Sequence, residues 1–220
     1  MENFKPKKLD KSNIIFLSFE GIEGCGKSTQ IQLVSEFLTK NTEYTIHHFR
    51  EPGGTEFGES LRNAMLGAKD KVSPLSEAHL FAASRCQLLT ERVLPLSTST
   101  KNIVIYDRYI HSSIAYQGFG SELGVDTVLD IHSHYPLNIL PHLTIYLEID
   151  QMTSLERQEK RNNKKDYFES KENEFYKKVI NGFMWCKNNL ENFLTIDGTM
   201  NKEHVKNEII KSVTRLLHES

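Results

Sequence analysis

The chain has few cysteines, no marked excess of charge and no long hydrophobic run, and each absence excludes a class of protein. Its three cysteines among 220 residues, Cys25, Cys86 and Cys186, are widely spaced and include no Cys-x-x-Cys pair. This pattern argues against a disulfide framework or a zinc site and favours a reducing cytoplasm. No segment approaches the roughly 20 apolar residues that span a bilayer, so we expect no membrane partner.

The charge balance also limits the possible partners. Lysine and arginine together number 27 against 29 aspartates and glutamates, which gives a formal net charge of −2 at pH 7. This balance offers no general attraction to polyanions, so we expect no nucleic-acid partner and only local phosphate binding. Residues 1–13 carry lysines without an apolar segment, which predicts a flexible, solvated leader rather than a secretory signal. Residues 14–220 are predicted to form a single domain.

Short apolar runs alternate with longer segments in which the apolar residues have helical spacing. The predicted strands are residues 14–19, 45–49, 103–106, 143–149 and 193–196. The predicted helices are residues 26–40, 75–96, 152–161, 172–190 and 202–217. This alternation predicts an α/β fold of three layers, in which helices cover both faces of a parallel sheet of about five strands. The polar stretch 162–166 is predicted to be a mobile loop.

A glycine-rich loop follows the first predicted strand and matches the pattern G-x-x-x-x-G-K-[ST]. Glycines let successive backbone N–H groups face a phosphate, and the helix that follows adds the positive end of its dipole. We therefore predict a P-loop NTPase fold, with Lys27 on the β- and γ-phosphates of ATP and Ser28 on Mg²⁺. A glycine-rich turn that binds nothing is the alternative. The predicted ATP-binding residues are Gly21, Ile22, Glu23, Gly24, Cys25, Gly26, Lys27, Ser28 and Thr29.

Two further clusters follow strands of the same predicted sheet. Asp107 and Arg108 follow the third strand, where a carboxylate could hold Mg²⁺ through water and a guanidinium could neutralise phosphate charge. A structural ion pair at the strand end is the alternative. Arg50 begins the segment Arg-Glu-Pro-Gly-Gly-Thr after the second strand, and its planar fork suits a phosphate that must be held still. An ordinary turn, which Pro-Gly-Gly favours, is the alternative there.

These motifs, in this order and at this spacing, resemble those of thymidylate kinases, the nucleoside monophosphate kinases that convert dTMP to dTDP. The resemblance covers nearly the whole chain and rests on segments 19–29, 50–55 and 107–117. It implies transfer of the γ-phosphoryl group of ATP to dTMP with Mg²⁺, and a cytoplasmic homodimer with a lid loop. The residues that it implies for the substrate site are Arg50, Pro52, Phe81, Arg85, Arg108, Ser112, Ser113, Tyr116 and Gln117.

The resemblance assigns the base and the sugar to particular side chains. Phe81 matches the family ring that stacks on thymine, and Arg85, one helical turn later, matches the arginine that hydrogen-bonds thymine O4. Arginine has donors and no acceptor, so it suits the carbonyl of thymine and disfavours the amino group of cytosine. Tyr116 matches the aromatic residue that leaves no room for a ribose 2′-hydroxyl. Packing of Phe81 in the core, and capping of backbone groups by Ser113 and Gln117, are the alternatives.

The resemblance places the catalytic charges in the P-loop and in a lid. Gly24 stands where some members carry a basic residue, so the chain resembles the bacterial-type class whose lid supplies arginines. Arg157 and Arg161 match that role, and a surface helix of mixed charge is the alternative. Residues 166–169 read Asp-Tyr-Phe-Glu where members usually have Asp-Arg-x-Glu, so Tyr167 removes one expected cation. The predicted catalytic residues are Lys27, Arg108, Arg157, Arg161 and Glu23, the last of which matches the family acid near the sugar 3′-hydroxyl.

Two other functions fit parts of the sequence. A kinase for another (deoxy)nucleoside monophosphate would share the P-loop and differ in the base pocket. A nucleotide-dependent switch would bind ATP without transferring phosphate, and the arginines on the acceptor side argue against it. His47, His48 and His111 have no carboxylate or cysteine partners at ligand spacing, so we predict no metal site at these histidines.

Overall fold

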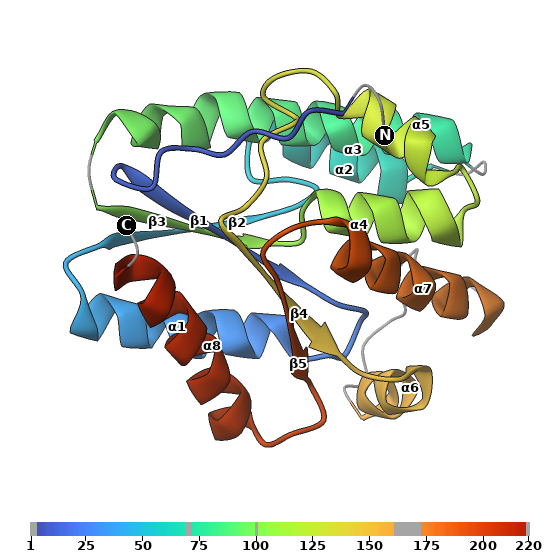
Figure 1. Ribbon diagram of the computed structural model, residues 1–220. Coiled ribbons are helices and arrows are strands. Elements are labelled where there is room, and N and C mark those ends of the chain that lie inside the picture. Colours follow the sequence, from blue (N-terminus) through green and yellow to red (C-terminus); the bar gives the residue numbers. More distant parts are fainter. Residues whose placement is uncertain (1–3, 69–71, 100, 161–172, 219–220) are drawn as a thin grey trace.

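The computed structural model describes residues 4–68, 72–99, 101–160 and 173–218. Its centre is a five-stranded parallel sheet in the order β2-β3-β1-β4-β5 (Figure 1). The strands are β1 (Ile14–Glu20), β2 (Thr45–Arg50), β3 (Asn102–Asp107), β4 (Leu143–Glu148) and β5 (Phe193–Asp197). The predicted α/β class and all five predicted strands are confirmed, with strand ends that differ by at most one residue.

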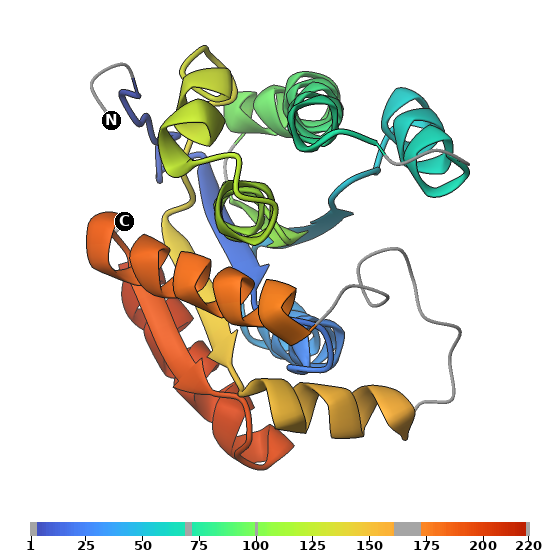
Figure 2. The same cartoon turned by 90° about the vertical axis from the view of Figure 1, so that its right-hand side faces the viewer.

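Helices lie on both faces of the sheet, so the molecule has the predicted three layers (Figures 1 and 2). The first and last helices pack together on one face, and the helices from the middle of the chain cover the other. No helix within the described ranges is long and apolar enough to cross a membrane. The helical segments are α1 (Lys27–Asn41), α2 (Glu56–Leu66), α3 (Pro74–Leu88), α4 (Ile110–Ser113), α5 (Val125–Ile131), α6 (Gln151–Glu159), α7 (Asn173–Asn189) and α8 (Lys202–His218), with π-helical η1 (Leu89–Val93) and η3 (Ile114–Gly120) and the 3-10 helix η2 (Leu94–Thr98).

The central strand β1 is buried along its whole length, and its side chains alternate between the two layers. Ile15, Leu17 and Phe19 belong to the hydrophobic cluster that includes residues of α1 and α8. Ile14 and Phe16 belong to the second cluster, which includes residues of α3 and η1. Burial on both faces explains why β1 reads as a continuous apolar run rather than as an alternating pattern.

The sequence predicted five helical segments that the structure contains, but it did not predict α2, α5 or the α4–η3 segment. Glycine explains the last omission, because it is a poor helix former. A Cβ atom at Gly120 would lie 2.6 Å from the ring of Phe175, and one at Gly182 would lie 2.6 Å from the Cα of Ala115. These glycines therefore allow η3 and α7 to approach closely, a requirement that depends on tertiary contact.

Most described residues of the predicted leader are exposed, but the segment also makes contacts with the rest of the chain. Phe4 is buried in the second hydrophobic cluster, and Lys7 pairs with Ile139 as an isolated bridge. His142 ties the segment to the sheet, because its ring contacts both the N–H of Phe16 at 2.9 Å and the carbonyl of Leu9 at 2.8 Å. Residues 4–13 are thus anchored beside the start of β1.

Phe4→Ala should lower the free energy of unfolding by about 2 kcal/mol, which is the usual gain from burying a side chain of this kind. Chemical denaturation of the two proteins measures the difference. Lys5→Ala is the matched control, because Lys5 is the next residue in the same segment and its side chain is exposed. Equal stability of the Phe4 and Lys5 variants would contradict the anchoring role.

The carboxyl ends of β2, β3 and β1 meet at one edge of the sheet and position the predicted motifs together. Arg50 lies opposite Asp107 in the register of β2 and β3, and Asp107 lies opposite Phe19 in the register of β3 and β1. The strand order changes direction beside β1, because β2 and β3 lie on one side of it and β4 and β5 on the other. Open α/β sheets bind ligands in the crevice outside such a point.

Candidate active site

A cavity of about 560 Å³ lies at this edge of the sheet, a volume in the usual range for small-molecule sites. All nine residues predicted for the substrate site line it, together with much of the P-loop. Of the other P-loop positions, Ile22 and Cys25 belong to the hydrophobic core behind the loop. The predicted residues that line the cavity are Glu23, Gly24, Gly26, Lys27, Ser28, Thr29, Arg50, Pro52, Phe81, Arg85, Asp107, Arg108, Ser112, Ser113, Tyr116 and Gln117.

The P-loop has the backbone that its glycines predict. Gly21, Gly24 and Gly26 have φ values of +139°, +76° and +101°, which side chains other than glycine rarely adopt. Gly26 is the N-cap of α1, so the positive end of that helix faces the cavity. The Lys27 ammonium donates to the carbonyl of Gly21 at 2.9 Å and to that of Ile22 at 3.2 Å. A cation is therefore held inside the loop.

Helix α6 packs directly on the P-loop, and this contact accounts for Gly24. A Cβ at Gly24 would lie 3.1 Å from the backbone oxygen of Ser154 and 3.4 Å from the Cβ of Arg157. The Ser154 hydroxyl donates to the Glu23 carbonyl, and Arg157 Nη1 donates to the carbonyls of Gly24 and Gly198. The structure thus places Arg157 against the loop rather than on the cavity wall. Arg161 and the segment 162–169 lie outside the described residues.

Arg108 occupies the centre of the site, between the P-loop and the start of α4. Its Nη2 donates to Glu23 at 2.8 Å, and its Nη1 donates to the Gly21 carbonyl at 3.1 Å and to Ser112 at 3.2 Å. Its guanidinium also lies 5.1 Å from the ring centre of Tyr116. Arg108 has a φ of +73°, a left-handed conformation that non-glycine residues adopt at a cost and that is common at functional sites. The alternative considered for these two residues, an ion pair between Asp107 and Arg108, is not among the hydrogen bonds and ion pairs of Arg108.

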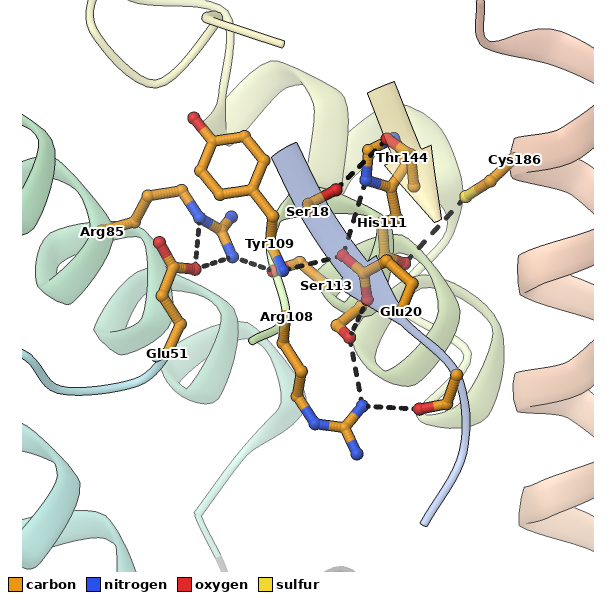
Figure 3. Close-up of polar contacts among 12 residues, drawn as sticks. Ser18, Glu20, Glu51, Arg85, Arg108, Tyr109, His111, Ser113, Thr144 and Cys186 are labelled. Atoms are coloured by element: carbon orange, nitrogen blue, oxygen red, sulfur yellow. Dashed lines mark hydrogen bonds and ion pairs between the residues drawn. The ribbon is translucent and has the colours of Figure 1, made fainter. Parts of the chain in front are cut away.

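Glu20, at the end of β1, is a residue of this site that the sequence did not single out. Its carboxylate is completely buried and accepts from the Tyr109 N–H at 2.8 Å and from the Ser112 hydroxyl at 2.6 Å (Figure 3). His111 Nδ1 lies 3.5 Å from the same carboxylate. Glu20 therefore fixes the backbone at Tyr109, the residue after Arg108, and orients the hydroxyl of Ser112. Its position directly before the glycine-rich loop was the signal in the sequence.

Arg85 is buried on the opposite side of the cavity, where protein groups hold its guanidinium. Its Nε donates to Glu51 at 2.7 Å, and its Nη2 donates to Ser113 at 3.1 Å. Its Nη1 lies 2.6 Å from His132 Nε2, and the guanidinium carbon lies 4.9 Å from the ring centre of Tyr109. Figure 3 shows the pair of Arg85 and Glu51 beside Ser113. Sequence reasoning missed both Glu51 and His132 as partners of this arginine.

The remaining walls combine rings with a polar amide. Tyr116 is only 6% exposed and makes edge-on contacts with Phe175 and Phe183, so its ring is fixed at the cavity surface. Gln117 donates to the buried Glu77 at 2.7 Å, which sets the direction of its amide. Phe81 lines the cavity from α3, one helical turn before Arg85. The lining thus includes both aromatic surface and hydrogen-bonding groups.

The turn after β2 is shaped by α2, which the sequence did not predict. Arg50 Nη2 contacts both carboxylate oxygens of Glu59 at 3.3 Å, and Glu59 also accepts from the Gly54 N–H at 3.0 Å. The Thr55 hydroxyl caps α2 by accepting from the Gly58 N–H. The additional lining residues that α2 and α7 contribute, and that the sequence did not identify, are Arg62, Met65, Leu66 and Tyr176. The spacing of Phe57, Leu61 and Met65 was the available signal for this helix.

Oxygen ligands for a hard cation are present at the cavity. The Ser28 hydroxyl and the Asp107 carboxylate both belong to its lining, as does the Glu23 carboxylate. Mg²⁺ prefers oxygen donors and is usually bound by one or two side chains together with water and substrate phosphates. These residues fit such a site. Within the described residues there is no group of three or more histidine, cysteine, aspartate or glutamate side chains that could hold a metal without such additional ligands.

The buried carboxyl group of Glu51 gives the protein a specific pH dependence. Burial raises the pKa of Glu51 from 4.5 to about 7, although the guanidinium of Arg85 lowers it. Between these two pH values the folded protein holds a proton that the unfolded chain has released. The free energy of unfolding therefore receives a contribution from Glu51 that is fully present below about pH 4.5 and is lost as the pH rises through about 7.

Glu51→Gln should remove this contribution, because an amide does not titrate. Unfolding free energies from urea denaturation at about pH 5, 6, 7 and 8 measure it in both proteins. We expect the wild-type curve to fall relative to that of the variant as the pH rises. Parallel curves across this range would show that Glu51 does not hold the extra proton.

The fold and the cavity define the class of the protein. A glycine-rich loop between the central strand and the first helix, with a lysine inside it, characterises P-loop nucleotide-binding proteins, and here arginines line the same cavity. A model of the thymidylate kinase family matches residues 19–209, which is most of the chain. The chain belongs to the thymidylate kinase family.

Curated relatives and a solved structure agree with this assignment. The chain is 39% identical over 203 residues to the thymidylate kinase of Thermoanaerobacter sp. strain X514, covering 92% of this chain and 98% of the relative. It is 40% identical over 200 residues to that of Mesomycoplasma hyopneumoniae strain 7448, covering 89% of this chain and 94% of the relative. The crystal structure of thymidylate kinase from Ehrlichia chaffeensis is similar with a TM-score of 0.69 and 30% identity, covering 91% of this chain and 99% of that one.

Proposed function

We propose that the protein is a thymidylate kinase that transfers the γ-phosphoryl group of ATP to dTMP, giving dTDP for dTTP synthesis. The observation that carries the proposal is a single cavity lined both by the P-loop lysine, Lys27, and by Arg50, Arg85 and Arg108. An ATP-binding loop alone would suit many classes of protein. Guanidinium groups in the same cavity add the means to hold a second anionic ligand, and membership of the family supports this choice of substrates.

The reaction needs no covalent intermediate, because phosphoryl transfer depends mainly on positioning and on stabilisation of charge. The P-loop and Lys27 would hold the ATP phosphates, and Arg50 and Arg108 would fix the acceptor phosphate. Arg108 is suited to the developing charge, since contacts to Glu23 and Ser112 already fix its guanidinium. Arg157 would act beside the loop that it contacts, and the role of Arg161 remains a prediction.

Mg²⁺ would be held by Ser28 and Asp107, the two predicted ligands that line the cavity. When bound, it would neutralise phosphate charge during transfer. The base would lie between Phe81 and Arg85, and Tyr116 would exclude a ribose 2′-hydroxyl.

We further propose that residues 14–220 act as one domain, that the protein works as a homodimer in the cytoplasm, and that small nucleotides are its only substrates. Light scattering of the purified protein tests the dimer.

The proposal is tested by ADP release in a coupled assay with ATP and Mg²⁺. The acceptors are dTMP, dUMP, CMP and thymidine, each at the same concentration. We expect release with dTMP and little with CMP or thymidine, because CMP carries an amino group at position 4 and thymidine has no phosphate to accept the transfer. Preference for CMP would favour a different nucleoside monophosphate kinase. ATP binding without acceptor-dependent ADP release would favour a nucleotide-dependent switch.

A further inference from the structure

The guanidinium of Arg85 is restrained at all three nitrogens, and the Glu51 carboxylate contacts two of them, Nε and Nη2, the latter at 2.5 Å. Glu51 accepts from Nε, Ser113 accepts from Nη2, and His132 lies against Nη1 at 2.6 Å. Glu51 and Ser113 themselves line the cavity with Arg85, whereas His132 follows α5 and is completely buried behind it. His132 is not a lining residue of the cavity, so it contacts the arginine from within the protein.

The second hydrogen bond of His132 determines which of its nitrogens can accept. His132 Nδ1 lies 2.7 Å from the Val128 carbonyl oxygen, which can only accept, so Nδ1 carries the ring proton. Nε2 is then a lone-pair acceptor for the Arg85 Nη1–H. Burial, together with the charge of Arg85, lowers the pKa of His132 to about 3, so the ring stays neutral at ordinary pH. The histidine is a fixed acceptor rather than a charge.

This contact decides what Arg85 can offer to a ligand. Nη1 carries two N–H groups, of which His132 takes one, and the other makes no hydrogen bond within the described ranges of the chain. A guanidinium has no acceptor atom, so the remaining group can only donate. Its direction follows from the planarity of the guanidinium, because Glu51 holds Nε and Nη2 and His132 holds the first N–H of Nη1.

Resting on the proposed function, we infer that His132 is a positioning residue that fixes Arg85 so that one Nη1–H is presented to the nucleotide base. The site then accepts a base with a carbonyl oxygen at that point and rejects one with an amino group. Within the described residues, His132 is the hydrogen-bond partner that restrains Nη1. A histidine outside the cavity thereby contributes to the choice between thymine-like and cytosine-like substrates.

Two substitutions separate the acceptor at Nε2 from the rest of the ring. His132→Asn keeps a donor near the position of Nδ1 and removes the acceptor that faces Arg85. His132→Gln places an amide oxygen near the position of Nε2 and can restore that acceptor. The probes are dTMP and 5-methyl-dCMP, which have the same sugar, phosphate and methyl group. Their bases differ at position 4, an oxygen against an amino group, and at N3, which carries a hydrogen only in thymine.

The ratio of kcat/KM for dTMP to that for 5-methyl-dCMP is measured in each protein. We expect His132→Asn to lower the ratio at least about tenfold, the effect of one hydrogen bond to a charged group, and to raise the KM for dTMP without changing the KM for ATP. His132→Gln should stay within about threefold of the wild-type ratio. A wild-type ratio in the Asn variant, or equal loss in both variants, would overturn the inference.

The wild-type protein separates this inference from the proposed function. No dTMP-dependent ADP release by the wild type would overturn both, whereas normal wild-type activity with an unaltered Asn variant would overturn the inference alone. Nitrogen NMR of the wild type remains decisive if His132→Asn does not fold. We expect a neutral ring protonated on Nδ1 from about pH 5 to about pH 8, with and without dTMP. A proton on Nε2 would rule out acceptance from Arg85.

Discussion

Arg108→Ala is expected to lower turnover by a factor of about 10³ while ATP affinity changes less than about threefold. Arg108 lies in the cavity beside the P-loop, and its fixed guanidinium would stabilise charge on the phosphoryl group during transfer. Loss of such a group affects the transition state far more than the bound nucleotide. Steady-state kinetics with saturating dTMP and a titration with labelled ATP measure the two quantities.

The contacts of Arg108 suggest the controls for this experiment. Arg108→Lys keeps the charge but lacks the fork that reaches Glu23 and Ser112 together, so it should recover little of the lost turnover. Arg92→Ala removes an exposed arginine that pairs with the neighbouring Glu91, and it should leave both quantities unchanged. An equal loss of turnover and of ATP affinity in Arg108→Ala would remove its proposed role in transfer.

Lys27→Met should reduce kcat/KM for ATP by about 10²- to 10³-fold, the cost of removing one charged donor from a phosphate-transfer site. Lys27 is only 7% exposed, and its ammonium donates to the carbonyls of Gly21 and Ile22. Nucleotide phosphates can replace these carbonyls as acceptors, whereas methionine fills a similar volume without a donor. The kinetic constants for ATP at saturating dTMP provide the measurement.

Lys40→Met is the matched control for Lys27→Met, because Lys40 lies in the last turn of the same helix and is exposed. It should retain wild-type kinetics. Thermal unfolding of both variants shows whether the loss at Lys27 comes from a disrupted loop. A Lys27→Met protein with normal stability and normal kcat/KM would contradict the assignment of the P-loop to ATP.

The sequence predicted the features that depend on local pattern. Short segments of sequence were enough to predict the strands, the P-loop glycines and the clusters at Arg50 and Arg108. In each segment the residue types favour one backbone conformation. Because strands in a parallel sheet present their carboxyl ends at one edge, placing these segments after strands also predicted that they meet. The structure places the predicted substrate residues around one cavity, while their individual roles remain proposals.

What the sequence could not predict depends on partners that are distant along the chain. The sequence does not show what Glu20 binds, because its partners, the backbone of Tyr109 and the hydroxyl of Ser112, lie 89 and 92 residues away. His132 belongs to no motif, and only folding places it against Arg85, 47 residues away. The contacts of the leader were missed for the same reason, since Ile139 and His142, which bind it, lie far along the chain.

The contact between Gly24 and α6 has a consequence for how this enzyme family can vary. Gly24 has a φ of +76°, and a Cβ there would lie 3.1 Å from the oxygen of Ser154. A side chain at position 24 would require α6 to shift by a few tenths of an ångström and would hold the backbone in a conformation that non-glycine residues rarely adopt. A side chain at position 24 and the close packing of α6 therefore compete for the same space, so we expect a substitution there to be accompanied by changes in α6.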